Sequence, residues 1–247
     1  MRKKASRVRR YNVVCLIART AALVVAVLWA WKGDLNGDLD AGFARFSPAT
    51  VLWLALMGSM VARLLPSRVE SLGCQKEFAA ACRPTGAMPS PGEVRQADRK
   101  ALGVASLWLG VNALFFIGYG LGWYDRRLMV CLAAFYGVCD IVCILFYCPF
   151  QAWIMHNRCC TTCRIYNWDY IMLCTPLFAI PSVYTATACA LSIVVFLRWE
   201  YTYRRYPERF FESGNEALRC ANCQEQLCYY KRCLSAGLKK RGAGGAD

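Results

Sequence analysis

Apolar runs of membrane-spanning length, separated by short charged stretches, set the limits on how this chain folds. Four runs stand out, at 12–31, 49–65, 102–123 and 128–150. A transmembrane helix needs about 20 mainly apolar residues, because the hydrocarbon core of a bilayer is about 30 Å thick. In lipid the backbone polar groups are satisfied within the segment, which favours helices. The sequence therefore predicts an all-α, polytopic membrane helix bundle with four clear spans over residues 1–150.

A fifth hydrophobic unit, 170–198, is broken by Pro176 and Pro181. It has two interpretations: a single kinked span, or a re-entrant hairpin whose two ends face the same compartment. Length favours the single span, because about 20 residues suffice to cross. The four arginines between 198 and 209 favour the hairpin, because basic residues mark the cytoplasmic side. We give the hairpin a slight preference.

Basic residues set the predicted orientation. Residues 1–10 carry six Lys or Arg and no acid, and the polar loop 66–101 carries six more. Both segments are expected on the cytoplasmic side of the plasma (inner) membrane, which agrees with two crossings between them. The net charge of +14 thus lies at the flanks of apolar runs, without the alternation of basic and stacking aromatic residues that marks a nucleic-acid groove. The expected partner is the lipid bilayer, with no nucleic acid.

Sixteen cysteines accompany a single histidine, and two clusters of them lie in the polar segments of 151–233 that flank the fifth unit. Cys160 and Cys163 form one Cys-x-x-Cys pair, and Cys220 and Cys223 form another. Such a turn points two sulfurs at one ion, and two turns make the tetrahedral thiolate set that suits zinc. The sequence predicts a shared zinc site at these four cysteines. Additional candidate ligands are Cys159, Cys228, Cys233 and His156.

Three alternatives to zinc stay open. An iron–sulfur cluster also takes four thiolates. The clusters would otherwise be reduced or redox-active thiols without metal, and in an oxidising compartment they would form disulfides. A gap of 56 residues separates Cys163 from Cys220, so every shared-site hypothesis needs the intervening segment to return to the same face.

Asp140 lies near the middle of the predicted span 128–150. A carboxylate at that depth costs about 3 kcal/mol and usually faces the bundle interior or a water-filled pocket. Arg19 and Arg63, from other spans, are its predicted partners. Asp140 is interpreted either as a proton-relay or substrate-contact group, or as a structural hydrogen-bonding group that holds the bundle together.

The sequence defines no enzymatic reaction, since it has no phosphate-binding loop, no His-Glu-x-x-His and no serine nucleophile elbow. Three hypotheses follow. The first is a membrane protein whose cysteine-ligated site has a structural or interaction role, with a protein partner or a second copy at the cysteine-rich face. The second is a membrane redox or electron-transfer protein. The third is a small transporter-like protein centred on Asp140. Residues 234–247 are predicted to be disordered.

Overall fold

A computed structural model describes residues 6–157, 159–223, 225 and 228 of the chain. Over these residues every regular element is helical and there is no strand, only an isolated bridge between Pro84 and Asn215. Cys233 and the segment 234–247, for which ligation and disorder were predicted, lie outside the described residues. The predicted all-α class is confirmed.

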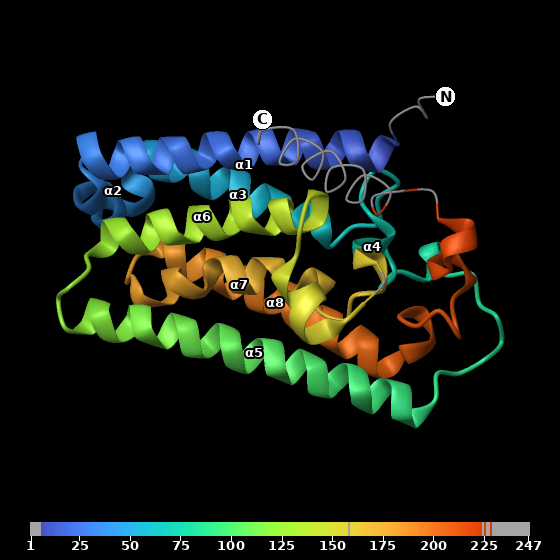
Figure 1. Cartoon of the computed structure of the whole chain (residues 1–247). Helices are drawn as coiled ribbons and strands as arrows, with labels where there is room; N and C mark the ends of the chain where they lie inside the picture. The colour runs from blue at the N-terminus through green and yellow to red at the C-terminus, as the bar shows by residue number, and fades with distance from the viewer. Residues whose placement is uncertain (1–5, 158, 224, 226–227, 229–247) are drawn as a thin grey trace, which may run out of the picture.

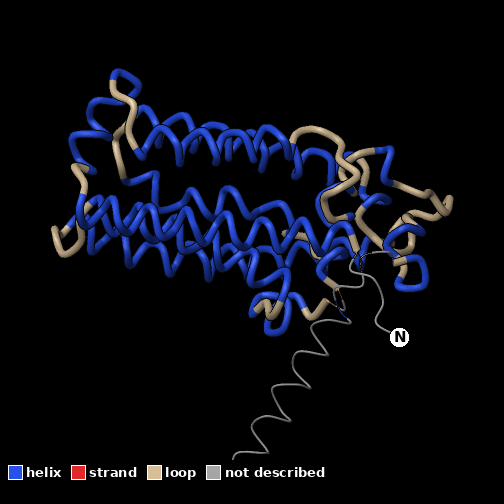
Figure 2. The backbone as a smooth tube through the Cα atoms, turned by 90° about the horizontal axis from the view of Figure 1, so that it is seen from above, coloured by secondary structure: helices blue, strands red, loops and turns tan. Residues whose placement is uncertain are grey.

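Long helices lie side by side along one axis and form the bundle (Figures 1 and 2). Within the described residues, four of them are long and apolar enough to cross a membrane: α1 (Arg7–Lys32), α5 (Pro91–Gly120), α6 (Arg126–Leu145) and α8 (Val183–Arg205). The predicted span 49–65 is α3 (Pro48–Arg63), which meets this test only together with Leu35–Ala44, from which it bends by 65°. That preceding segment consists of α2 (Leu35–Ala41) and the 3-10 turn η1 (Gly42–Ala44).

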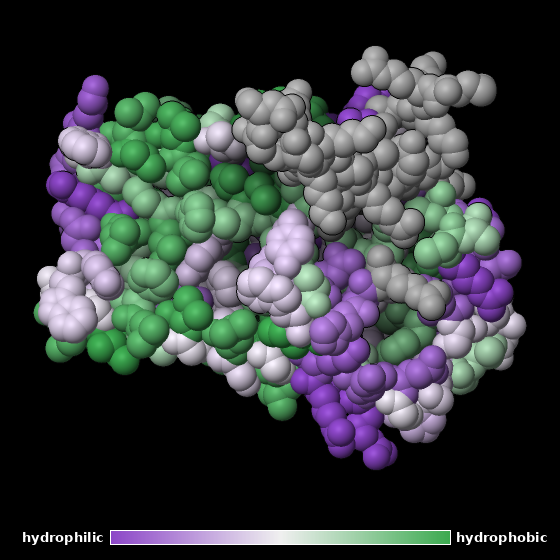
Figure 3. All heavy atoms as spheres, in the orientation of Figure 1, coloured by the Kyte–Doolittle hydropathy of each residue, from purple (hydrophilic) through white to green (hydrophobic). Residues whose placement is uncertain are grey.

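Large apolar side chains cover the outside of the bundle. Leu114 on α5 is 69% exposed and Leu197 on α8 is 56% exposed, and α1 and α3 present valines and leucines in the same way. Figure 3 shows hydrophobic residues over the middle of this face and hydrophilic residues towards both ends of the bundle. A soluble monomer rarely exposes so large an apolar surface. Such an apolar surface is compatible with helices that lie in a membrane.

The bundle has two ends. Residues 64–90, 146–168 and 206–223 form what we call the loop end, together with the start of α1. Residues 33–47, 121–125 and 180–182 form the turn end. The predicted loop 66–101 is shorter than expected, because Ser90 and Glu93 form a capping box that starts α5 at Pro91. The predicted span 128–150 ends early, at Leu145, shortly before Pro149, which has no N–H to continue the helical hydrogen bonds.

The fifth hydrophobic unit is a hairpin. Its first arm consists of α7 (Asp169–Cys174) and the 3-10 helix η6 (Thr175–Ala179), and it runs to the turn end, where Ser182 Oγ donates a hydrogen bond to the carbonyl of Leu39 (2.9 Å). The second arm, α8, packs against the first arm and returns to the loop end, where Trp199 Nε1 donates to the carbonyl of Arg164 (2.9 Å). Both ends of the unit therefore lie at the same end as the N-terminus. The hairpin is confirmed and the single kinked span is wrong, although the second arm is a full-length helix.

The loop end has a small aromatic core, formed by the last turns of α8 and the segment that follows it. Trp199, Tyr203 and Phe210 pack together, with ring centroids 4.8 Å apart for Trp199–Phe210 and 5.2 Å apart for Tyr203–Phe210. The segments of the loop end also contain short elements: α4 (Leu72–Gln75), η2 (Ala79–Ala81), the π-helix η3 (Gln151–Met155), η4 (Cys160–Thr162), η5 (Tyr166–Trp168), η7 (Pro207–Arg209), η8 (Glu216–Leu218) and η9 (Cys220–Asn222).

Candidate functional site

Asp140 is paired with Arg19, one of its two predicted partners. Nη1 of Arg19 lies 2.5 Å from Oδ2 of Asp140 and also donates to the carbonyl of Gly137 (2.9 Å). A second carboxylate, Asp169 at the start of α7, lies 3.8 Å from Nη2 of Arg19. The pair therefore ties α1 to α6 and reaches the hairpin, as expected of an ionised group in the bundle interior.

Arg63, at the end of α3, extends this network towards the loop end. Its guanidinium donates to Oδ1 of Asn167 (2.8 Å) and Oδ2 of Asp169 (3.3 Å), contacts Sγ of Cys74 (2.9 Å), and lies 3.6 Å from Oε1 of Glu70. Arg63 is only 7% exposed. Its planar group carries five N–H donors in a fixed arrangement and can therefore serve several acceptors on different sides at once. The two arginines face three carboxylates: Asp140, Asp169 and Glu70.

A cavity of about 300 Å³ lies beside this network, lined by α1, α3, α6 and the hairpin. Along α1 its lining reaches from Tyr11 to Trp29. These residues are 18 positions apart on one helix, or about 27 Å at 1.5 Å per residue. The cavity therefore extends over most of the thickness of a hydrocarbon core, which is about 30 Å.

The two halves of the cavity differ in chemistry. Towards the turn end the lining is mainly apolar, with alanines such as Ala22, Ala26 and Ala133 beside the larger side chains of Trp29 and Leu177. Towards the loop end it is polar and includes Tyr11, Asn12, Arg19, Arg63, Asp140 and Tyr170. Asn12 is 4% exposed, and its Nδ2 has no hydrogen-bond partner among the described residues. A buried amide donor without an acceptor is costly, so the polar half can satisfy a further oxygen atom.

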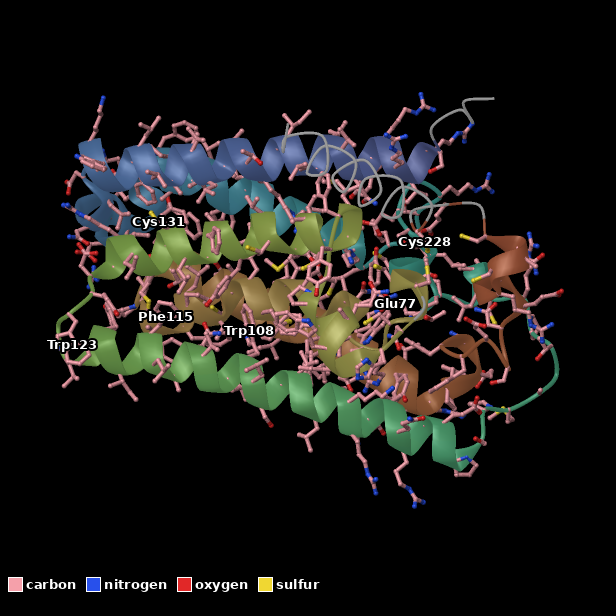
Figure 4. The ribbon with its side chains drawn as sticks, viewed as in Figure 1. Glu77, Trp108, Phe115, Trp123, Cys131 and Cys228 are labelled. Carbon is pink, nitrogen blue, oxygen red and sulfur yellow. The ribbon has the colours of Figure 1, made fainter. Side chains whose placement is uncertain are left out.

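The cysteine clusters both lie at the loop end, but their closest contact is not the predicted one. Sγ of Cys228 donates to Sγ of Cys159 at 3.4 Å, and Thr161 Oγ1 also donates to Cys159 Sγ (3.1 Å). Figure 4 shows Cys228 at the loop end, on the same side of the molecule as Glu77. The hydrogen bond to Cys159, together with burial, raises the pKa of the Cys228 thiol. Both residues were named only as additional ligands.

The four main predicted ligands are distributed differently. Cys163 is buried beside Lys76, and burial raises the pKa of its thiol. The thiol of Cys160 donates to Oε1 of Gln151 (3.1 Å), Cys220 is exposed, and Cys223 is partly buried. Among the residues that the structure describes, no group of three or more His, Cys, Asp or Glu is placed to hold a metal ion. The zinc and iron–sulfur hypotheses therefore gain no support here and stay predictions. His156 is exposed, with a left-handed backbone (φ 51°), as expected of a surface residue.

Lys76 organises the cysteine-containing turn, a role that the sequence did not suggest. Its side chain is fully buried, and Nζ donates to the carbonyls of Thr161 (2.8 Å) and Cys163 (2.7 Å). It also lies 5.3 Å from the ring centroid of Trp199. Burial lowers the pKa of this amine to about 7. A lysine in a polar loop gives no local signal of burial, because its acceptors are 85 and 87 residues away in the chain.

Fold and site together define an all-α bundle with helices of membrane-spanning length, an interior ion-pair network and a cavity of two chemical halves. No family model, no curated protein and no solved structure matches this chain.

Proposed function

We propose that the chain is an integral membrane protein that binds an amphipathic, lipid-like molecule between its helices. The cavity supports this proposal, because it follows the bundle axis and joins an apolar half to a polar half. An amphipath would place its chain along Ala22, Ala26 and Ala133 and its head beside Asn12. This proposal narrows the transporter-like hypothesis to a class of ligand and assigns Asp140 to the wall of the polar half.

The charges of the network indicate a head group without net negative charge. Two guanidinium groups, Arg19 and Arg63, are matched by the carboxylates of Asp140, Asp169 and Glu70. No positive charge in this group is left over to attract a phosphate, and a further anion would meet three carboxylates. Asn12 instead offers an amide donor that a neutral ester carbonyl or hydroxyl oxygen would accept.

The proposed ligand class also fits the depth of these groups. Asn12 lies in the second turn of α1, at the edge of the spanning segment, where the ester groups of a membrane lipid are found. The apolar lining begins at Ala22, about 15 Å further along the helix axis. A neutral lipid of the leaflet at the loop end would therefore have its head and its chain at the matching depths.

A photoreactive diacylglycerol, with a diazirine in one acyl chain, tests this function. The purified chain is placed in lipid nanodiscs with this probe, irradiated, digested and mapped by mass spectrometry. We expect labelling of residues that line the cavity, above the labelling of lipid-facing positions. A matched phosphatidic acid probe is expected to label the cavity more weakly, because its head is anionic.

Two substitutions on α1 provide the matched pair. Ala22 lines the cavity, whereas Ala21 is exposed on the outside of the helix. Ala22→Phe is expected to fill the apolar half and to lower cavity labelling at least about fivefold, the effect of roughly 1 kcal/mol of lost binding. Ala21→Phe should leave it unchanged. Equal labelling in both variants, with unchanged thermal unfolding, would contradict the proposal.

A further inference from the structure

Glu225 is held at the loop end by hydrogen bonds to its buried carboxylate. Glu225 is 6% exposed and accepts hydrogen bonds from the hydroxyl of Ser71 (2.8 and 3.1 Å) and from the backbone N–H of Leu72. Its own carbonyl accepts a hydrogen bond from Ser6 Oγ (3.1 Å) at the start of α1. Residue 225 is therefore connected to two parts of the chain that are more than 150 positions away in sequence.

This anchor brings Cys228 to Cys159. The two sulfurs are 3.4 Å apart, within van der Waals contact, and no disulfide joins the described cysteines. A disulfide bond needs about 2.05 Å between the sulfurs. The remaining approach is about 1.4 Å, the scale of a side-chain rotation rather than of a refolded loop.

The two cysteines differ in surroundings. Cys159 is buried, and its sulfur accepts hydrogen bonds from Cys228 and from Thr161. The ammonium group of Lys76 lies close enough for its charge to interact with Cys159. Cys228 is more accessible, so an external reagent meets it first.

We propose that Cys159 and Cys228 are a redox-active thiol pair that forms a disulfide and fastens the C-terminal segment to the cysteine turn. This is a modification site beyond the proposed lipid binding, and it does not depend on that function. The oxidant is a low-molecular-weight disulfide of the glutathione class.

The reaction consists of two exchange steps. Cys228, the more accessible of the two, first loses its proton to solvent. Its sulfur then attacks one sulfur of the glutathione disulfide, so that a mixed disulfide forms and one glutathione thiolate leaves. The thiolate of Cys159 then attacks the Cys228 sulfur of the mixed disulfide, and the second glutathione thiolate leaves. The two protein thiols lose two electrons and two protons, and the glutathione disulfide gains them to become two glutathione thiols.

Graded mixtures of reduced and oxidised glutathione test the pair on the purified full chain. Remaining thiols are blocked with N-ethylmaleimide, and trypsin releases the peptide 159–164, which carries Cys159, and the peptide 220–231, which carries Cys228. We expect these peptides to be joined by one disulfide at oxidising ratios and separated again at reducing ratios.

Single serine variants assign the bond to its sulfurs. Cys159→Ser and Cys228→Ser should each abolish the joined peptide. The matched controls, Cys160→Ser and Cys220→Ser, change neighbours in the same two peptides and should keep it. Oxidation should also slow hydrogen exchange of the α4 segment at least about tenfold in the parent chain, but not in Cys228→Ser.

Three results would overturn the proposal. One is a joined peptide that persists in Cys228→Ser, which would assign the bond to Cys220 or Cys223. Another is the absence of any joined peptide at every ratio while thermal unfolding shows a folded protein. The third is one bound zinc per purified chain that is lost in both Cys159→Ser and Cys228→Ser, because these sulfurs would then be metal ligands.

Discussion

Replacing the Arg19–Asp140 ion pair measures how strongly the interior network holds the bundle. At an effective dielectric constant of about 20, two unit charges about 4 Å apart attract each other by about 4 kcal/mol. Removing one partner of a buried pair costs about 3–5 kcal/mol, because the other charge stays behind uncompensated. Arg19 would keep Asp169 at 3.8 Å, so we expect the lower end of this range. Arg19→Leu and Asp140→Leu should each destabilise the chain by about 3 kcal/mol.

The double variant decides whether the two side chains act as one unit. If they do, Arg19→Leu with Asp140→Leu should also cost about 3 kcal/mol rather than about 6, which gives a coupling energy of about 3 kcal/mol. Reversible unfolding in mixed detergent and dodecyl sulfate micelles, followed by circular dichroism, measures these free energies. The Arg126–Asp40 pair at the turn end (2.7 Å) is the control. Its Asp40 is 61% exposed, so its coupling should stay below about 1 kcal/mol.

Additivity of the two single substitutions, with a coupling energy no larger than that of the control pair, would refute this reasoning. The charges would then be separated, solvated or neutral in the membrane.

Three further predictions concern other parts of the chain. Arg63→Met removes a buried guanidinium from all of its acceptors, so we expect the free energy of unfolding to fall by about 3–5 kcal/mol in the same assay. A fall of less than about 1 kcal/mol would contradict a stabilising role of this network. Burial raises the pKa of Glu225 from its usual 4.5 to about 7, so the contact of Glu225 with Ser71 and Leu72 is strongest below about pH 4.5 and weakens as the pH rises towards 7. Hydrogen exchange of the α4 segment, corrected for the intrinsic rate, should become faster over this pH range. Glu225→Gln should remove this pH dependence of the exchange rate, and a variant with the same pH dependence as the parent chain would show that Glu225 is not its cause. Gly118→Ala should lower the free energy of unfolding by about 1–3 kcal/mol, because the ring of Tyr124 occupies the space that the new Cβ would take. Gly110→Ala on the same helix has open space around it and should not destabilise the chain, so equal effects of the two substitutions would contradict this packing.

Much of the bundle could be predicted from residue patterns. Apolar runs identified the long helices, because the hydrocarbon core of a bilayer dictates the length of an apolar span, but they did not locate every helix end. The arginines between 198 and 209 correctly predicted the hairpin, whereas the length of the hydrophobic unit 170–198 favoured a single span. The pairing of Asp140 with Arg19 was also predictable, because an ionised group inside a membrane needs a partner of opposite charge.

The boundaries of α5 and α6 were harder to predict. Polar residues 91–101 looked like part of a loop, yet the capping box at Ser90 and Glu93 starts the helix there. Helix ends depend on one or two capping residues, whereas apolar patterning only defines the part inside the membrane.

The cysteine site shows where local spacing stops being informative. Cys-x-x-Cys spacing selected Cys163, but Lys76 holds the carbonyl of that residue in the core of the loop end. The contact between Cys159 and Cys228 instead depends on Glu225, whose partners Ser71 and Leu72 precede it by more than 150 residues. No pattern of neighbouring residues contains such contacts.

The interior network also imposes an order on biogenesis. Arg63 is synthesised 106 residues before Asp169, and Arg19 is synthesised 121 residues before Asp140. In a chain inserted into a membrane, the early helices would therefore enter the bilayer before the carboxylates of Asp140 and Asp169 have left the ribosome, although Glu70 follows Arg63 closely. The long aliphatic part of an arginine side chain would allow its guanidinium group to stay at the membrane–water interface until then. Insertion of the hairpin, which carries Asp169, would then be the step at which Arg19 and Arg63 form their ion pairs in the interior and the helices complete their packing.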